Sequence, residues 1–422
     1  MAQPAVSKSK KNTGVVSEKS TTAAPSAASQ VIEGAWGRHP FLGYDWVLII
    51  AVILILFYGL LMLYSASAYT SLQTFGYATY YIKKQLFATG VGLVIMVIVS
   101  FLPMKFWNVM SLPAIAVGIC LVLLVKTSLG VESNGAVRWL NIGGFSLQPA
   151  EVLKFATILI LAFMVSHLFR WIDDWRIFFP VFILGLVPAA VVAFVTDDLG
   201  TAIIFFGILF VVLALSCRRI QYLIVSFIVI AAAAVYFIMS EEYRRLRIYA
   251  WLNIEDYADT KGYQIIQGLY AIGSGGFFGK GIGKSTQKLS FVPEAENDMI
   301  FSIICEELGI FGVILLCLLY GVIIWRMKKV FDNAKDVYAR LVVAGVAAHI
   351  GVQAVVNMCV VTNLLPNTGV PLPFISFGGT SSMILLAEIG LVLSVARGNN
   401  IPRSTLRKKK KKKRPKRAAS GA

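Results

Sequence analysis

The sequence predicts an all-α polytopic membrane protein with ten transmembrane helices. Of its 422 residues, 57% are hydrophobic and the mean hydropathy is +0.74, values that soluble globular domains do not reach. Apolar runs long enough to cross ~30 Å of hydrocarbon recur along the chain. Because backbone polar groups in lipid must be paired within their own segment, we expect each run to be a helix.

The apolar runs divide the chain into a membrane domain, residues 46–396, and two polar tails. Residues 1–45 are rich in Ser, Ala and Lys, lack a signal-peptide pattern and are predicted to be disordered, and residues 397–422 form a basic tail. The ten predicted spans are 46–66, 87–104, 108–126, 150–168, 178–195, 199–217, 222–239, 300–325, 341–361 and 374–396.

The distribution of lysine and arginine predicts that both termini are cytoplasmic. Basic residues precede the first span and follow the fourth, sixth, eighth and tenth, which all fall on one side if ten helices alternate. The segments 127–149, 240–298 and 362–373 then face outward, and 240–298 is a large extracellular loop between helices 7 and 8.

The net charge of +17 owes much to the run Lys408–Lys413. This run is typical of a topology anchor attracted to anionic lipid, or of a contact with a cytoplasmic partner. No other feature supports nucleic-acid binding. Three scattered histidines and five cysteines without CxxC spacing predict no metal site.

Two outward segments carry unusual charges. Arg138 lies in NGAVRW, and Glu151 and Lys154 lie three apart on one helix face, where they either form an ion pair or line an outward cavity. Asp197 and Asp198 precede the sixth helix. An N-cap explains one of these carboxylates, and an additional site role for Asp198 stays open.

Further polar residues lie beside the predicted outward cavity. Gln353 and Asn357 are four apart in the ninth helix, where they face the cavity or form interhelical hydrogen bonds. Ser376 belongs to a Pro- and Gly-rich turn before the tenth helix. Irregular backbone at membrane depth is tolerated only where protein or a water-filled cavity covers it.

The long outer loop combines cations with glycines, which allow close approach of the backbone to a ligand. Backbone amides and cationic side chains suit a diphosphate, although a flexible basic loop explains the pattern equally well. The cations are Arg244, Arg245, Arg247, Lys280, Lys284 and Lys288.

Asp298 lies where this loop meets the eighth span. A charge at that boundary suggests chemistry at the membrane surface. The alternative is that Asp298 is the N-cap of the eighth helix.

Several motifs in order resemble the SEDS (shape, elongation, division and sporulation) family over nearly all of the chain between helices 1 and 10. They are NGAVRW with FSLQPAEVLK, DLGTA, GKGIGKSTQKLSFVPEAENDMIF, GVQAVVNM and LLPNTGVPLPFISFGG. The spacing of the long loop is closer to FtsW and SpoVE members than to RodA. The chain departs from the family pattern at Asp197, Glu296, Asn297 and Phe377.

The resemblance implies a peptidoglycan glycosyltransferase of the bacterial cytoplasmic membrane that polymerises lipid II on the outer face, in cell division or sporulation. It implies that Asp298 is the essential carboxylate. The implied partners are a class B penicillin-binding protein, which is a transpeptidase, and other division or sporulation membrane proteins.

This chemistry fits the residues. A diphosphate leaves readily once its charge is offset, so one base and several cations are sufficient. We expect Asp298 to be the base. A divalent cation, Mg²⁺ or Mn²⁺, could assist, although no ligand cluster identifies one. The alternative function is a flippase or transporter of lipid-linked precursors, which intramembrane carboxylates such as Glu388 would suit.

Overall fold

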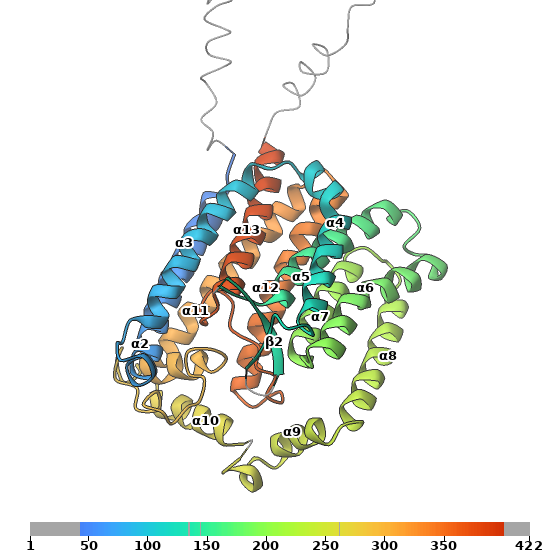
Figure 1. Ribbon diagram of the computed structural model, residues 1–422. Helices are drawn as coiled ribbons and strands as arrows, with labels where there is room; N and C mark the ends of the chain where they lie inside the picture. The colour runs from blue at the N-terminus through green and yellow to red at the C-terminus, as the bar shows by residue number, and fades with distance from the viewer. Residues whose placement is uncertain (1–42, 134–135, 144, 261, 401–422) are drawn as a thin grey trace, which may run out of the picture. The chain divides into compact units, whose positions relative to one another are not determined.

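The computed structural model describes residues 43–133, 136–143, 145–260 and 262–400, which form a bundle of long helices (Figure 1). Most of both predicted tails, and Asn134 and Gly135 of the NGAVRW motif, lie outside the described residues. The long helices are α2 (Trp46–Phe75), α3 (Tyr80–Phe101), α4 (Met104–Leu124), α5 (Pro149–Leu168), α6 (Trp175–Val195), α7 (Leu199–Ala214), α8 (Ile220–Met239), α11 (Ile300–Asn333), α12 (Val337–Val361) and α13 (Gly379–Asn400).

Each predicted span coincides with one of these helices. In the described part of the chain, nine are long and apolar enough to cross a membrane, and the protein is a multi-pass membrane protein. The predicted span 199–217 corresponds to α7, which has only 16 residues. The count of ten spans therefore stays a prediction.

Two of the segments predicted to face outward contain structure that the sequence did not predict. A small antiparallel sheet, β1 (Gly130–Ser133), β2 (Ala136–Ile142) and β3 (Phe145–Leu147), lies between α4 and α5 with β2 in the middle. Leu140 pairs with Gly130 on one side and with Leu147 on the other. The all-α prediction was wrong for this segment, because its strands are too short to give a clear alternating pattern.

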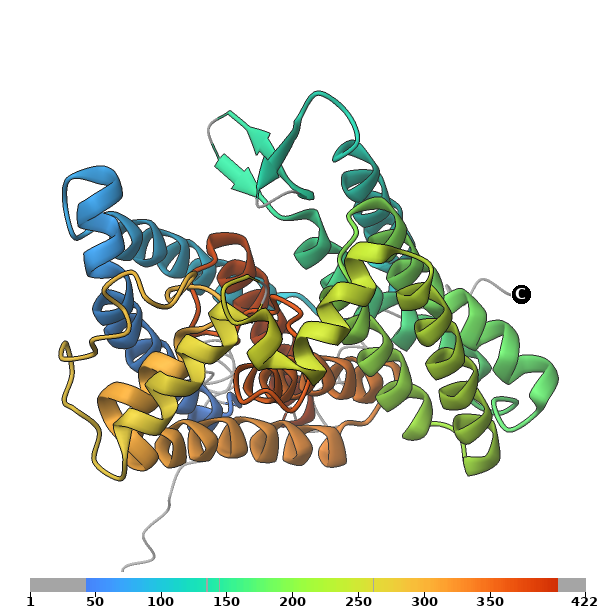
Figure 2. The ribbon, with the colours of Figure 1, turned by 90° about the horizontal axis from the view of Figure 1, so that it is seen from below.

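The segment predicted as a large loop contains helices. These are α9 (Glu242–Leu252), the 3₁₀ helix η1 (Ile254–Tyr257) and α10 (Tyr263–Gly275). They lie at the end of the bundle opposite to the start of α2 and the end of α13 (Figure 1). Seen from below, α9 and α10 extend across that end (Figure 2).

The core is organised around α12, which packs against α5, α7, α11 and α13. Its residues Val342, Val346 and Ile350 are fully buried. In contrast, α8 exposes large apolar side chains such as Phe227 and Ile228 along most of its length. Exposed apolar side chains on a span-length helix are expected where the solvent is lipid.

Helix α11 is broken at Gly309, whose φ of 62° and ψ of −156° are not helical. The loop after α10 pairs with the broken turn. Lys280 and Gly281 donate their backbone N–H groups to the carbonyls of Glu306 and Glu307, both at 2.9 Å, and the N–H of Ile310 donates to the carbonyl of Gly276 at 3.2 Å. Backbone groups that the break removes from the helix ladder are thus paired by the loop.

Glycine is required at this break. A Cβ on Gly309 would lie 2.5 Å from the backbone nitrogen of Gly279, and its positive φ is unfavourable for other residues. We predict that Gly309→Ala lowers stability by ~1–3 kcal/mol, measured as a lower melting temperature of the detergent-solubilised protein. The control is Gly321→Ala on the same helix, where a Cβ meets nothing within 4 Å. Equal melting temperatures for the two variants would contradict the role assigned to Gly309.

Candidate functional site

Asp298 lies in the turn that precedes α11 and is held by carboxamide side chains. Its Oδ1 accepts a hydrogen bond from Gln264 Nε2 at 3.3 Å, and its backbone carbonyl accepts one from Asn357 Nδ2 at 2.8 Å. The N-cap of α11 is Met299, which makes no side-chain capping bond. The alternative that Asp298 caps this helix is therefore wrong.

The turn before α13 forms the other side of this carboxylate. A Cβ on Gly369, whose φ is 69°, would lie 3.8 Å from Asp298 Oδ2. Asn367 donates from Nδ2 to Gln264 Oε1 at 2.9 Å, and its Oδ1 accepts from the N–H of Gly369 at 3.1 Å. Asn357 also donates to the carbonyl of Val370 at 2.8 Å. Asp298 and this turn are thus fixed relative to each other by three carboxamides.

The environment of Asp298 favours its protonated form. Burial, followed by the nearby charge of Glu294, raises the pKa of Asp298 to about 7. Among the described lysines and arginines, none forms an ion pair with it. A carboxylate with a pKa near neutrality can both accept and release a proton at physiological pH.

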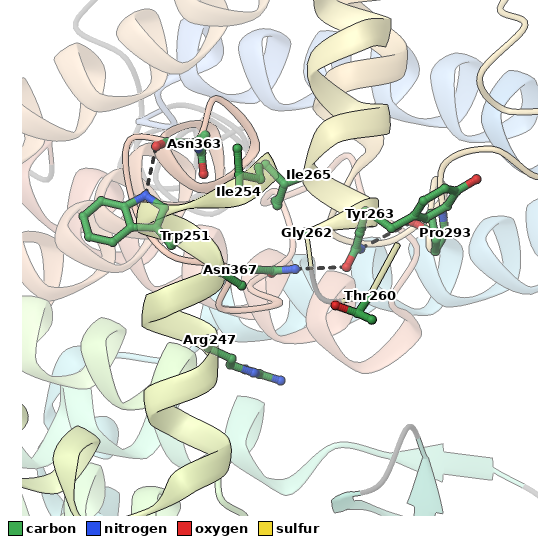
Figure 3. A pocket seen from close by; sticks show the side chains of 12 residues that line it. Arg247, Trp251, Ile254, Thr260, Gly262, Tyr263, Ile265, Pro293, Asn363 and Asn367 are labelled. Atoms are coloured by element: carbon green, nitrogen blue, oxygen red, sulfur yellow. Dashed lines mark hydrogen bonds between the residues drawn. The ribbon is translucent and has the colours of Figure 1, made fainter. Parts of the chain in front are cut away.

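A pocket of about 290 Å³ is lined by α9, the start of α10 and the turn after α12 (Figure 3). Gln264, which donates to Asp298, is one of its lining residues. The others are Arg247, Ala250, Trp251, Ile254, Thr260, Gly262, Tyr263, Ile265, Pro293, Asn363 and Asn367. Of these, Arg247 was one of the predicted loop cations, and Pro293 and Asn367 stood in motifs that the sequence singled out. The aromatic side chains gave no signal, because a single Trp or Tyr in a loop is not distinctive.

Predicted site residues Arg138, Asp198 and Arg244 gather at the start of α7. Asp198 is the N-cap, accepting from the N–H of Thr201 at 2.9 Å, and it lies 3.6 Å from Arg138 Nη1. Arg244 Nη2 lies 3.3 Å from Asp197 Oδ1. The N-cap prediction is confirmed for Asp198, whereas Asp197 pairs with α9.

This arginine–aspartate cluster lies against the same turn as Asp298. A Cβ on Gly200 would lie 2.5 Å from the carbonyl of Thr368, the neighbour of Gly369. The predicted cation Arg245 is exposed on α9. Two neighbouring residues of the turn, Thr368 and Gly369, thus lie close to the start of α7 and to Asp298, respectively.

The structure gives two of the predicted diphosphate-binding lysines another role. Lys280 Nζ lies 2.6 Å from Glu306 Oε1 and Lys288 Nζ lies 2.7 Å from Glu307 Oε1, and both glutamates are fully buried. Both lysines are held at short distance by fully buried carboxylates, whereas the ion pairs of Arg138 and Arg244 are longer, at 3.6 and 3.3 Å, so we do not assign the diphosphate to these lysines. Lys284 is exposed.

The glycines of this loop pack against α11. Added Cβ atoms on Gly275 and Gly279 would lie 1.9 Å from the carbonyl oxygen of Cys305 and 2.2 Å from that of Glu307. These two positions therefore serve the contact with the broken helix, and the interpretation that they allow approach to a ligand was wrong for them.

Glu151 and Lys154 form the predicted ion pair, at 2.8 Å, and are almost completely buried. Lys154 also donates to Gln353 Oε1 at 2.9 Å, and the same oxygen lies 2.9 Å from His349 Nε2. His349 Nδ1 lies 2.8 Å from Glu388 Oε2. The five side chains form one buried polar network that links α5, α12 and α13.

The network ends at the turn beside Asp298. Gln353 donates from Nε2 to the carbonyl of Pro371 at 3.0 Å. Ser376, another predicted site residue, accepts from the N–H of Leu372 at 2.8 Å and is buried. Gln353, Asn357 and Ser376 therefore position the turn in this structure.

Comparisons with known proteins identify the family. The family described as "Cell cycle protein", which comprises FtsW, RodA and SpoVE, matches residues 45–401. The chain is a SEDS family member of the FtsW and SpoVE type. It is 36% identical over 358 residues to "Stage V sporulation protein E" of Bacillus subtilis, covering 84% of this chain and 97% of that protein.

Further similarities cover the same region. A "Probable peptidoglycan glycosyltransferase FtsW" of Trichlorobacter lovleyi is 34% identical over 371 residues, covering 86% of this chain and 96% of that protein. Among solved structures, a chain from a peptidoglycan synthase complex described as coordinating polymerization and crosslinking has a TM-score of 0.69 at 27% identity, covering 85% of this chain and 99% of that chain. The rod shape determining protein RodA of Thermus thermophilus has a TM-score of 0.63 at 27% identity, covering 86% of this chain and all of that one.

The buried lysine–glutamate pairs predict a contrast between neighbouring lysines of the long loop. Lys288→Ala leaves Glu307 as an unmatched buried charge, so we expect a loss of ~3–5 kcal/mol of stability. Lys284→Ala removes an exposed side chain four residues away and should have little effect. Thermal unfolding in detergent measures both, and an unchanged melting temperature for Lys288→Ala would show that this pair does not hold the loop.

Proposed function

We propose that this SEDS protein is a peptidoglycan glycosyltransferase that polymerises lipid II on the outer face of the cytoplasmic membrane, in cell division or sporulation. Similarity to proteins named FtsW and SpoVE supports this activity. The observation that carries the site assignment is Asp298, a carboxylate with a pKa of about 7 that is held by Gln264 beside a pocket.

In the proposed reaction, a hydroxyl oxygen of the acceptor sugar attacks the anomeric carbon of the donor sugar. The bond between that carbon and the lipid diphosphate breaks, and the diphosphate leaves with the bonding electrons. Asp298 takes the hydroxyl proton. A general acid is not required, because a diphosphate whose charge is offset is already a good leaving group.

We assign the diphosphate to the arginine side of the turn. Arg138 and Arg244 lie at the start of α7, and Arg245 is exposed nearby on α9. Guanidinium groups suit this role because they bind phosphate oxygens in a bidentate manner. The glycosidic bond would then form across the turn around Gly369, between the base and these cations.

A divalent cation stays an expectation. Among the described residues, no group of three or more His, Cys, Asp and Glu side chains comes together. A Mg²⁺ or Mn²⁺ ion would therefore depend on the diphosphate oxygens for several of its ligands, as Mg²⁺ commonly does.

The proposed setting is a complex at the outer membrane face. The similar chain of a peptidoglycan synthase complex supports a transpeptidase partner, which we propose is a class B penicillin-binding protein. The proposed orientation places both termini in the cytoplasm and α9 and α10 outside. This orientation is supported by the start of α2 and the end of α13, which lie at the end of the bundle opposite to α9 and α10 (Figure 1).

The base assignment predicts a large loss of rate in one isosteric variant. Asp298→Asn keeps the shape of the side chain and removes the proton acceptor, so polymerisation should fall by ~10²–10⁴-fold. The measurement is glycan formation from purified lipid II by the detergent-solubilised protein with its transpeptidase, and Asn297→Gln serves as a neighbouring control. Polymer made at the wild-type rate by Asp298→Asn would refute the base. Absence of polymer from the wild-type complex would instead favour the transporter alternative.

The raised pKa predicts the pH dependence of this assay. A base must be deprotonated to act, so kcat/KM should fall about tenfold per pH unit below a midpoint near pH 7 and level off above it. Glu294→Gln removes the second cause of the raised pKa and should move the midpoint to lower pH. A midpoint that stays near pH 4 in the wild type would contradict the buried environment of Asp298.

A further inference from the structure

The pocket beside Asp298 is built entirely from the segments outside the long helices. Arg247 and Trp251 come from α9, Tyr263 and Gln264 from the first turn of α10, and Asn367 from the turn after α12 (Figure 3). The carboxamide of Gln264 connects the pocket to the proposed base: it donates to Asp298 and accepts from Asn367. A ligand in this pocket would contact Gln264, the residue that donates to the proposed proton acceptor.

The lining has the chemistry of a saccharide site. Trp251 and Tyr263 provide aromatic rings, and Gln264, Asn363 and Asn367 provide carboxamides that can donate and accept hydrogen bonds. Aromatic rings with a few placed polar groups are typical of small-molecule sites, and rings pack well on the apolar faces of sugars.

The described part of the lining is better matched to a neutral ring than to a diphosphate. Among its described residues, Arg247 is the one cation, and there is no lysine. A group carrying two or more negative charges is usually met by several cations or by converging backbone N–H groups. Hydroxyl and acetamido groups require neither.

The pocket is small, and a hydrogen bond joins two of the segments that line it. Trp251 donates from Nε1 to the carbonyl of Asn363 at 3.0 Å, which joins α9 to the turn after α12 (Figure 3). Its volume of about 290 Å³ is at the lower end of the ~300–1,000 Å³ common for ligand pockets, which suits one sugar ring better than a disaccharide.

We infer that this pocket binds the terminal N-acetylhexosamine ring of the acceptor, so that its free hydroxyl points at Asp298. The inference rests on the proposed glycosyltransferase function and adds a location for one of its two substrates. Tyr263 is then a residue for acceptor affinity, and Asp298 is the residue for the chemical step.

Kinetics separate these two roles. Tyr263→Ala should raise the KM for lipid II about 2- to 12-fold, the range expected for losing one aromatic contact, with kcat little changed. Tyr263→Phe keeps the ring and should behave as the wild type. The matched control is Tyr270→Ala, which removes an exposed tyrosine from the same helix outside the pocket. A KM for Tyr263→Ala equal to that of Tyr270→Ala would overturn the inference.

A binding experiment tests the pocket without turnover. Saturation-transfer NMR on the Asp298→Asn protein, with a soluble disaccharide of N-acetylglucosamine and N-acetylmuramic acid that carries no lipid or diphosphate, should show transfer to the terminal ring. Tyr263→Ala in that background should abolish most of the transfer. If that variant does not fold, Tyr263→Leu, which fills the space without an aromatic face, replaces it.

The outcomes are distinct. Competition by inorganic pyrophosphate, or no transfer to the saccharide at millimolar concentration, would overturn the saccharide assignment. An active Asp298→Asn enzyme would refute the proposed base and leave the binding result intact.

Discussion

The pairing of the loop after α10 with the broken turn of α11 is the constraint on which the site depends. Gly309 interrupts the helix, and the backbone of residues 276–281 supplies the missing hydrogen bonds. A buried backbone group without a hydrogen-bond partner is costly, so these bonds hold the loop against the helix. The chain from Gly281 to Met299 is therefore closed at both ends by α11, and Asp298 occupies its last turn.

The buried glutamates strengthen this closure and at the same time isolate the base. Glu306 and Glu307 take the ammonium groups of Lys280 and Lys288, and neither lysine forms an ion pair with Asp298. Asp298 instead receives neutral carboxamide donors. A carboxylate next to a lysine would have a depressed pKa and would be a weak base. Burial and the charge of Glu294, without a paired cation among the described residues, keep Asp298 basic enough to accept a proton.

The sequence predicted the helices well because long apolar runs in lipid leave little choice but a helix, and all ten predicted ranges fall on helices. It also placed Asp298 at a boundary. It could not assign the lysines, since Lys280, Lys284 and Lys288 look alike in the loop, and only the folded structure brings two of them onto α11. The helices α9 and α10 were missed for a related reason. Their sequences are short and combine polar and apolar residues without a clear helical pattern. Contacts with distant turns, such as that of Trp251 with Asn363, help to hold these helices in place.

The polar side chains buried among the long helices are connected to the turn before α13, against which Asp298 lies. Glu151 is matched by Lys154 and Glu388 is matched by His349, and the carboxamide of Gln353 joins the two pairs before donating to Pro371. Proton-coupled transport would require such groups to exchange protons with alternate sides of the membrane. Here all five side chains are buried and hydrogen-bonded within the group. Outside the group, Gln353 donates to the carbonyl of Pro371, two residues from Gly369. Hydrogen bonds among buried polar groups make a region rigid. Glu151 Oε2 has no hydrogen-bond partner, but the other members are linked, and the bond from Gln353 to Pro371 connects them to the turn against which Asp298 lies.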